Sequence, residues 1–212
     1  MFQFTLLRHA QSQANVEAIY QGQSNTSLSE KGRLQAQRLA DRWQVEGRHF
    51  DGIFASALTR ASQTADIANQ ALQAPIDYDM LWAERDLGQL TGINHVDAPQ
   101  LMPPPPFVNP FTPYGNTGEG QWDLFLRAGQ GLKILLRQAP GAYLLVSHRA
   151  FLGMLMYTIF GIHPQANFHG PRFHFKNTGL TEITYNPASH QWRLHSFNDT
   201  AHLAGMDDER HT

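Results

Sequence analysis

An arginine–histidine pair, Arg8-His9, stands directly after the short apolar run from Phe2 to Leu7. A run of this length and composition predicts a buried strand that ends on the two polar residues. In open α/β sheets, ligands bind just beyond the carboxyl ends of the strands. A histidine ring can attack phosphorus, and an arginine guanidinium binds phosphoryl oxygens through several N–H donors. The pair therefore indicates phosphoryl chemistry, although an isolated histidine is often a structural residue.

Three further clusters place polar residues beside apolar runs in the same way. Arg60 follows the stretch 52–55, and His148 comes one residue after the run 143–146. Glu84 lies in the segment Leu81-Trp82-Ala83-Glu84-Arg85-Asp86-Leu87-Gly88, which we expect to be a loop. Three strand ends are thus expected to deliver Arg8 with His9, Arg60 and His148 to one edge of a sheet.

The order and spacing of these clusters resemble those of the histidine phosphatase superfamily, which includes the cofactor-dependent phosphoglycerate mutases and many small phosphatases. The resemblance begins at Leu6, includes the Gln21-Gly22 loop and the segment 28–32, and extends to the tail segment 198–203. It therefore covers most of the chain. Another branch of the superfamily has an aspartate directly after its second histidine, whereas this chain has Arg149 there, so the resemblance is to the branch that uses a glutamate as proton donor.

The resemblance implies a role for each residue of the expected site. His9 would be the nucleophile and would form a phosphohistidine, and Glu84 would protonate the leaving oxygen. The phosphoryl oxygens would be held by Arg8, Arg60, His148 and Asn15. Because positive and hydrogen-bonding side chains would do this, we expect neither a metal ion nor a cofactor. Repulsion between like charges is expected to lower the pKa of His9.

The resemblance also implies residues that contact the rest of the substrate. Gln21 and Gly22 match a family loop that closes over the phosphate and the organic group. Ser12 could contact substrate, but its hydroxyl could equally begin a helix. Arg149 replaces the glycine that is usual there, and either points to solvent or adds a second contact to an anion.

The remaining pattern predicts a single α/β domain over residues 1–212, with a mostly parallel sheet and helices on both faces, as in the three-layer sandwich of phosphoglycerate mutases. Helices are expected over 29–45, 58–72, 121–138 and 149–160, each with an apolar face. The third should turn Trp122, Phe125, Leu126, Gly129, Leu132 and Leu136 inward. Strands are expected at about 2–7, 52–55, 142–147, 172–177, 180–185 and 192–197, with an antiparallel edge at the end.

Residues 92–120 differ from the rest because they are rich in proline and aromatic residues and contain neither Lys nor Arg. The run Pro103-Pro104-Pro105-Pro106 excludes a regular helix or a central strand there. We interpret this insertion as a lid over the site, since long irregular segments in compact domains are usually functional loops. The alternative is a polyproline motif that docks a partner domain.

Composition narrows the class of protein further. The 212 residues include no cysteine, carry a formal net charge of −2 and are 42% hydrophobic, which excludes disulfides and thiol catalysis. No basic run suggests a nucleic-acid or membrane partner, and no segment resembles a signal peptide or a membrane span. We therefore expect a soluble cytoplasmic protein, either a monomer or a homodimer.

Three functions are compatible with these features. The first is a phosphatase that hydrolyses a small phosphorylated metabolite through a phosphohistidine. The second is a cofactor-dependent phosphoglycerate mutase, which needs a second anion site and exclusion of water. The third is a non-catalytic scaffold that binds a phosphorylated ligand. The absence of Lys and Arg from the lid favours the phosphatase, and the joint presence of His9, Glu84 and His148 argues against the scaffold.

Overall fold

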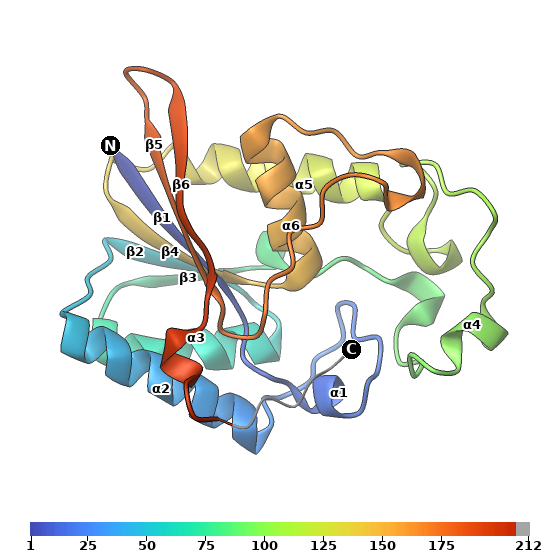
Figure 1. Cartoon of the computed structure of the whole chain (residues 1–212), viewed down its shortest axis with the longest axis horizontal. Helices are drawn as coiled ribbons and strands as arrows, with labels where there is room; N and C mark the ends of the chain where they lie inside the picture. Colours follow the sequence, from blue (N-terminus) through green and yellow to red (C-terminus); the bar gives the residue numbers. More distant parts are fainter. Residues whose placement is uncertain (207–212) are drawn as a thin grey trace.

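The computed structural model describes residues 1–206, which form one six-stranded sheet with helices on both faces (Figure 1). Residues 207–212 of the expected domain lie outside the described part of the chain. The strand order is β3-β2-β4-β1-β5-β6. The strands are β1 (Phe2–Arg8), β2 (Gly52–Ser56), β3 (Ile76–Asp79), β4 (Ala142–Ser147), β5 (Leu180–Asn186) and β6 (Gln191–Asp199).

The mostly parallel sheet with an antiparallel edge is confirmed. Strands β3, β2, β4 and β1 pair in parallel, whereas β5 pairs antiparallel with both β1 and β6. Two strand predictions were wrong. Residues 172–177 form no strand, and the short strand β3 was missed because only its first residue, Ile76, is apolar and at least partly buried. 

Four long helices cover the sheet, α2 and α3 on one face and α5 and α6 on the other (Figure 1). Ser29 caps α2 as expected, because its hydroxyl accepts a hydrogen bond from the Gly32 N–H. Gly161 ends α6 in the left-handed conformation that favours glycine. The bounds are α2 (Glu30–Glu46), α3 (Thr59–Leu72), α5 (Gln121–Leu135) and α6 (Arg149–Phe160).

The alternation of side chains along β1 builds a separate core on each face of the sheet. Phe4 and Leu6 pack into the core beneath α5 and α6, and Leu7 packs into the core beneath α2 and α3. Alanines on α3, such as Ala61 and Ala65, are fully buried and let that helix approach the sheet closely. This tight packing fixes the strand ends that carry the candidate site.

The inward face of α5 matches the predicted one in part. Its fully buried side includes Leu124, Ala128 and Leu135, whereas the predicted Leu126 is 53% exposed. Three other predicted residues are partly buried against the same core: Phe125, Leu132 and Leu136. The rings of Trp122 and Phe125 also lie close to the ring of His163, so the helix contacts the segment after α6 as well as the core.

The insertion at 92–120 is mostly irregular, as predicted. It contains one short helical turn, α4 (Ala98–Leu101), and it reaches away from the sheet (Figure 1). Its far end is anchored, because Val108 and Asn167 hydrogen-bond to each other in both directions at 2.7 and 2.8 Å. Across residues 1–206, no helix has the length and apolar character needed to cross a membrane.

Candidate active site

The neighbouring parallel strands β2, β4 and β1 bring their carboxyl ends to one edge of the sheet. In the register of β1 and β4, Arg8 lies opposite Ser147, so His9 and His148 each stand one residue beyond the paired ends. Their ring centroids are 5.0 Å apart. Arg60 joins them from the first turn of α3, which follows β2. We call Arg8, His9, Arg60 and His148 the floor of the site.

His9 is oriented by its own backbone neighbour. Its Nδ1 lies 2.7 Å from the Ala10 carbonyl oxygen, which can only accept, so Nδ1 carries the proton. The lone pair is then on Nε2, the atom that a nucleophilic histidine needs. Burial, followed by the charges of Arg60 and Arg8, lowers the pKa of His9 well below its usual value. The ring is therefore neutral at neutral pH.

Of the two floor arginines, Arg60 is buried and Arg8 is partly buried, and backbone carbonyls hold both. Arg8 Nη1 donates to the Phe175 carbonyl at 2.8 Å, and Arg60 donates to the carbonyls of Gly22 and Ser24, also at 2.8 Å. Burial is the main cause that lowers the pKa of each arginine, to about 10, so both stay charged at neutral pH. Their Nε atoms are buried and have no hydrogen-bond partner within residues 1–206. Two charged guanidinium groups with unpaired N–H donors are suited to bind an anion.

His148 is fully buried and makes one hydrogen bond, between its Nε2 and the Ser56 hydroxyl at 2.8 Å. That hydroxyl also accepts from the Leu58 N–H, so its own proton is free to point at Nε2. The Nδ1 atom then carries the ring proton and has no partner among the described residues. Burial, then Arg60, lowers the pKa of His148 well below its usual value, so the ring acts as a neutral donor.

Glu84 lies across from the floor at the N-terminus of α6. Its carboxylate accepts hydrogen bonds from the N–H groups of Arg85, Ala150 and Phe151 at 2.8 to 3.3 Å. An anionic group is favoured at a helix N-terminus. No ion pair of residues 1–206 includes Glu84.

Arg127 of α5 fixes the loop that carries Glu84. Its guanidinium donates to the carbonyls of Leu81, Ala83 and Glu84 at 2.7 to 3.1 Å. It also forms an ion pair with Glu119 at 2.6 Å. Sequence reasoning missed Arg127 as a positioning residue, and the available signal was an arginine within a strongly apolar helix.

Asn177 is the second residue that sequence reasoning missed. Its side-chain Nδ2 donates to the His9 carbonyl at 2.8 Å and lies 3.5 Å from Asn15 Oδ1. The residue links the turn before β5 to the nucleophile segment after β1. No local pattern marks Asn177, because its partners lie more than 160 positions away in the sequence.

The predicted substrate contacts Asn15 and Gln21 have their side-chain oxygens engaged. Asn15 Oδ1 accepts from the Ser12 N–H at 3.1 Å, and Gln21 Oε1 accepts from the Ser12 hydroxyl at 2.8 Å. Within residues 1–206 neither amide nitrogen has an acceptor, so each can donate to a ligand. Ser12 itself is fully buried and caps the short helix α1 (Gln13–Val16), so its hydroxyl serves the protein interior.

Gly22 adopts a left-handed conformation with φ of +51°, which favours glycine. A Cβ atom there would lie 2.8 Å from Thr91 Oγ1, so a side chain would press on the start of the lid insertion. Because Arg60 binds the Gly22 carbonyl, the loop is tied to the floor.

Arg85, next to Glu84, is only 8% exposed and lies between two aromatic rings. Its guanidinium carbon is 5.2 Å from the ring centre of Tyr114 in the lid insertion and 5.8 Å from that of Phe168. No ion pair of residues 1–206 includes it. Arg85 thus connects the Glu84 loop to the insertion at 92–120 through its cation–π contact with Tyr114.

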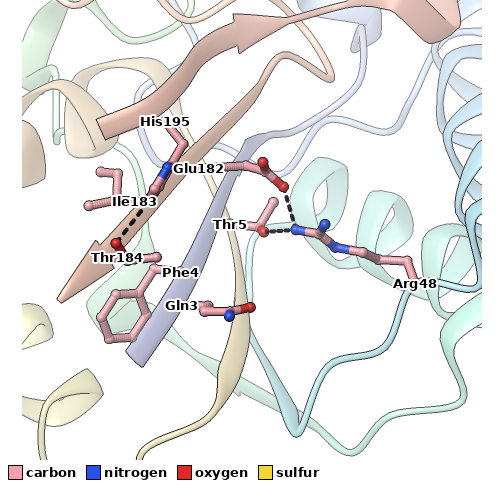
Figure 2. A pocket seen from close by; sticks show the side chains of 8 residues that line it. All are labelled: Gln3, Phe4, Thr5, Arg48, Glu182, Ile183, Thr184 and His195. Atoms are coloured by element: carbon pink, nitrogen blue, oxygen red, sulfur yellow. Dashed lines mark hydrogen bonds and ion pairs between the residues drawn. The ribbon is translucent and has the colours of Figure 1, made fainter. Parts of the chain in front are cut away.

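A hollow of about 220 Å³ lies elsewhere, on the part of the sheet formed by β1, β5 and β6 (Figure 2). Its polar groups satisfy one another: Arg48 binds Glu182 and Thr5, and His195 binds Thr184. None of its lining residues is a predicted site residue. The hollow therefore does not compete with the strand-end site as a place for an anion.

Within residues 1–206, no three His, Cys, Asp or Glu side chains are grouped so that they could hold a metal ion. The strand-end site instead combines two arginines, two neutral histidines and one carboxylate. Such a set can bind a phosphoryl group, attack its phosphorus and supply a proton.

Known proteins resemble this chain over nearly its full length. A protein of Cronobacter sakazakii named "Probable phosphoglycerate mutase GpmB" is 32% identical over 96% of this chain and 95% of its own. The protein of the same name from Salmonella typhi is 31% identical with the same coverage.

Solved structures share the fold at lower identity. A mycobacterial glucosyl-3-phosphoglycerate phosphatase superposes with a TM-score of 0.77 at 24% identity, covering 93% of this chain and 99% of the other. A phosphoserine phosphatase of Entamoeba histolytica, in complex with 3-phosphoglyceric acid, gives 0.78 at 22% identity, covering 96% and 100%.

The family model described as "Histidine phosphatase superfamily (branch 1)" matches residues 4–200. This range contains the whole floor, Glu84 and the lid insertion. The chain therefore belongs to branch 1 of the histidine phosphatase superfamily.

Proposed function

We propose that the protein is a phosphomonoesterase that hydrolyses a small phosphorylated metabolite through a phosphohistidine at His9. The observation that carries the proposal is the orientation of His9. Its Nδ1 is bound by the Ala10 carbonyl, and its Nε2 is unprotonated within the positive field of Arg60 and Arg8. A neutral, oriented imidazole within a cationic pocket is suited to attack on phosphorus.

The reaction follows from the roles of the side chains. His9 Nε2 forms a bond to phosphorus while the phosphorus–oxygen bond to the organic group breaks, and Glu84 gives its proton to the departing oxygen. Repulsion from a phosphate dianion favours the protonated form of a nearby carboxyl. Water then attacks the phosphohistidine and gives a proton to Glu84. Inorganic phosphate leaves, and His9 and Glu84 return to their starting states.

The floor supplies the charge stabilisation that phosphoryl transfer requires. Three buried donors of the floor have no partner in residues 1–206: Arg8 Nε, Arg60 Nε and His148 Nδ1. Phosphoryl oxygens would accept hydrogen bonds from them. Asn15 and Gln21 add neutral donors, as does the Gly22 N–H. We therefore propose that turnover needs no divalent metal, because the chain's own donors do the work that a metal does in other enzymes.

The composition of the lid favours hydrolysis of the phosphohistidine over transfer of its phosphoryl group back to the bound substrate. Residues 92–120 contain neither Lys nor Arg, so this insertion supplies no cation for the carboxylate of a phosphoglycerate. The mutase remains the second candidate because the curated relatives at 31–32% identity carry that name. A mutase would have to find its second cation elsewhere in the site.

Product analysis by phosphorus NMR separates the two functions. We would offer the purified protein 3-phosphoglycerate and a panel of phosphomonoesters, with EDTA and no added metal. Inorganic phosphate is the expected product, and its rate across the panel ranks the substrates. Conversion to 2-phosphoglycerate with little free phosphate would establish the mutase, and activity that EDTA removes and Mg²⁺ restores would contradict the metal-free mechanism.

A further inference from the structure

Arg149 is the first residue of α6 and directly follows the floor residue His148. A cation at this end of a helix is unfavourable, because the helix N-terminus carries a partial positive charge. The first turn of α6 contains no acidic residue that would compensate. A residue that opposes the preference of its own helix indicates a role that depends on tertiary contacts.

The exposed Arg149 side chain extends to the loop that precedes β5. Its Nη2 lies 3.4 Å from Nδ1 of His174. No ion pair formed within residues 1–206 includes Arg149. With Nδ1 facing the guanidinium as acceptor, the His174 proton is on Nε2, where it can be donated to a ligand.

Arg149 also stands close to the floor. After burial, its charge is the strongest influence that lowers the pKa of Arg8. It likewise lowers the pKa of His174 and of His95, in each case after burial. Arg8, Arg149, His174 and His95 therefore share one region, and Lys176 adds to the positive field at His174. The negative charge of Glu84 raises the pKa of Arg8 and partly offsets these effects.

We propose that Arg149 and His174 form a second anion subsite beside the phosphate-binding floor. The substrate would then be a phosphomonoester whose organic part carries a second anionic group, a carboxylate or another phosphate. This inference rests on the proposed phosphatase function and specifies its substrate class. A guanidinium can bind either anion through two parallel N–H donors. Because the insertion at 92–120 contains neither Lys nor Arg, Arg149 and His174 are the residues that would select a substrate with a second negative charge.

Matched esters test the subsite. In the first pair, 3-phosphoglycerate and glycerol 3-phosphate differ by a carboxylate. In the second, 1,3-propanediol bisphosphate and 1,3-propanediol monophosphate differ by a phosphate. We expect the Arg149→Ala variant to lose about tenfold to hundredfold more kcat/KM for the doubly anionic member than for its partner, as removal of a charged hydrogen bond predicts. The pair with the larger change identifies the second anion.

Further variants sharpen the result. Arg149→Lys should recover part of the discrimination, because charge is kept while the planar fork is lost. His174→Ala should lose part of it. The control is Arg137→Ala, which removes the same charge from an exposed position after the last turn of α5 and should not alter activity on any of the four esters. Equal losses for both members of each pair, or no loss, would overturn the subsite.

Binding to the His9→Ala protein judges the subsite independently of turnover. Calorimetry should give tighter binding of 3-phosphoglycerate than of glycerol 3-phosphate, or of the bisphosphate than of the monophosphate, and Arg149→Ala should abolish the difference. If the wild-type protein hydrolyses none of the esters, the proposed function fails. The binding difference still decides the subsite in that case: its presence supports the subsite, and its absence overturns it.

Discussion

The floor of the site and the lid insertion are built in opposite ways. His9, Arg60 and His148 are at most 3% exposed and are held by hydrogen bonds to fixed groups on the sheet and its loops. In the insertion, by contrast, Phe107 is 59% and Phe111 65% exposed. The floor carries the groups proposed to act on phosphorus, whereas the insertion carries exposed aromatic surface and neither Lys nor Arg. We expect mutations in the two regions to have different effects on the reaction and on the choice of substrate.

The largest expected effect is on the floor. His9→Ala should lower kcat by about 10⁴-fold or more, as removal of a catalytic nucleophile does in other enzymes. Phosphorus NMR or phosphate release would measure it on any active ester. A thermal melt near that of the wild type would show that the fold is intact. Substantial turnover by this folded variant would remove His9 as the nucleophile.

The next effect concerns proton donation opposite the floor. Glu84→Gln should reduce hydrolysis of alkyl phosphates by about 10²- to 10⁴-fold, the usual contribution of a general acid. Hydrolysis of p-nitrophenyl phosphate should fall much less, because its leaving group needs no proton. Steady-state rates on both esters provide the comparison, and equal losses on the two would contradict the role of Glu84.

A smaller effect is expected where α5 holds the Glu84 loop. The double change Arg127→Met with Glu119→Gln removes the ion pair without leaving a buried charge alone. We expect kcat on alkyl phosphates to fall by about tenfold to hundredfold, as for a displaced catalytic group, with little change in KM. Loss of stability alone, with kcat per folded molecule unchanged, would make Arg127 a structural residue only.

Buried neutral histidines on the floor should make stability depend on pH. The pKa of His9 and that of His148 lie well below 6.5 in the folded protein. The unfolded chain therefore takes up protons that the folded chain does not, and stability falls as the pH drops below about 6.5. Each ring contributes up to about 1.4 kcal/mol per pH unit in this window.

Urea unfolding at pH 7, 6 and 5 would measure this dependence. The variant His9→Asn keeps a donor for the Ala10 carbonyl but has no titrating ring, so its free energy of unfolding should decline less steeply. Parallel declines for the variant and the wild type would show that His9 is not held neutral by the fold.

The smallest effect is expected in the lid. Replacement of Phe107 and Phe111 by serine should change kcat on p-nitrophenyl phosphate by less than about threefold, since exposed substitutions seldom disturb a fold. The ranking of larger esters by kcat/KM should change more. A loss on all esters as great as that of Glu84→Gln would mean that the lid takes part in the chemistry.

The floor could be predicted because Arg8, His9 and His148 stand at the ends of apolar runs, and because the order and spacing of these clusters and of Arg60 resemble those of a known family. The segment 172–177 was misassigned. Its alternating Phe173 and Phe175 look like a strand, but Phe175 is buried while its carbonyl binds the Arg8 guanidinium instead of a neighbouring strand. Arg127 and Asn177 could not be predicted, because their partners are defined only when distant segments meet.

The position of β1 has a consequence for the order in which the protein is made. This strand comes first in the sequence, yet it pairs with β4 and β5, which end at Ser147 and Asn186. At about 5–20 residues per second, the ribosome needs roughly 10–40 s to add β5 after β1. The segment that ends in Arg8 and His9 lacks its β5 partner for all that time. A shortened chain that stops before β4 would contain the nucleophile but neither of the strands that pair with β1.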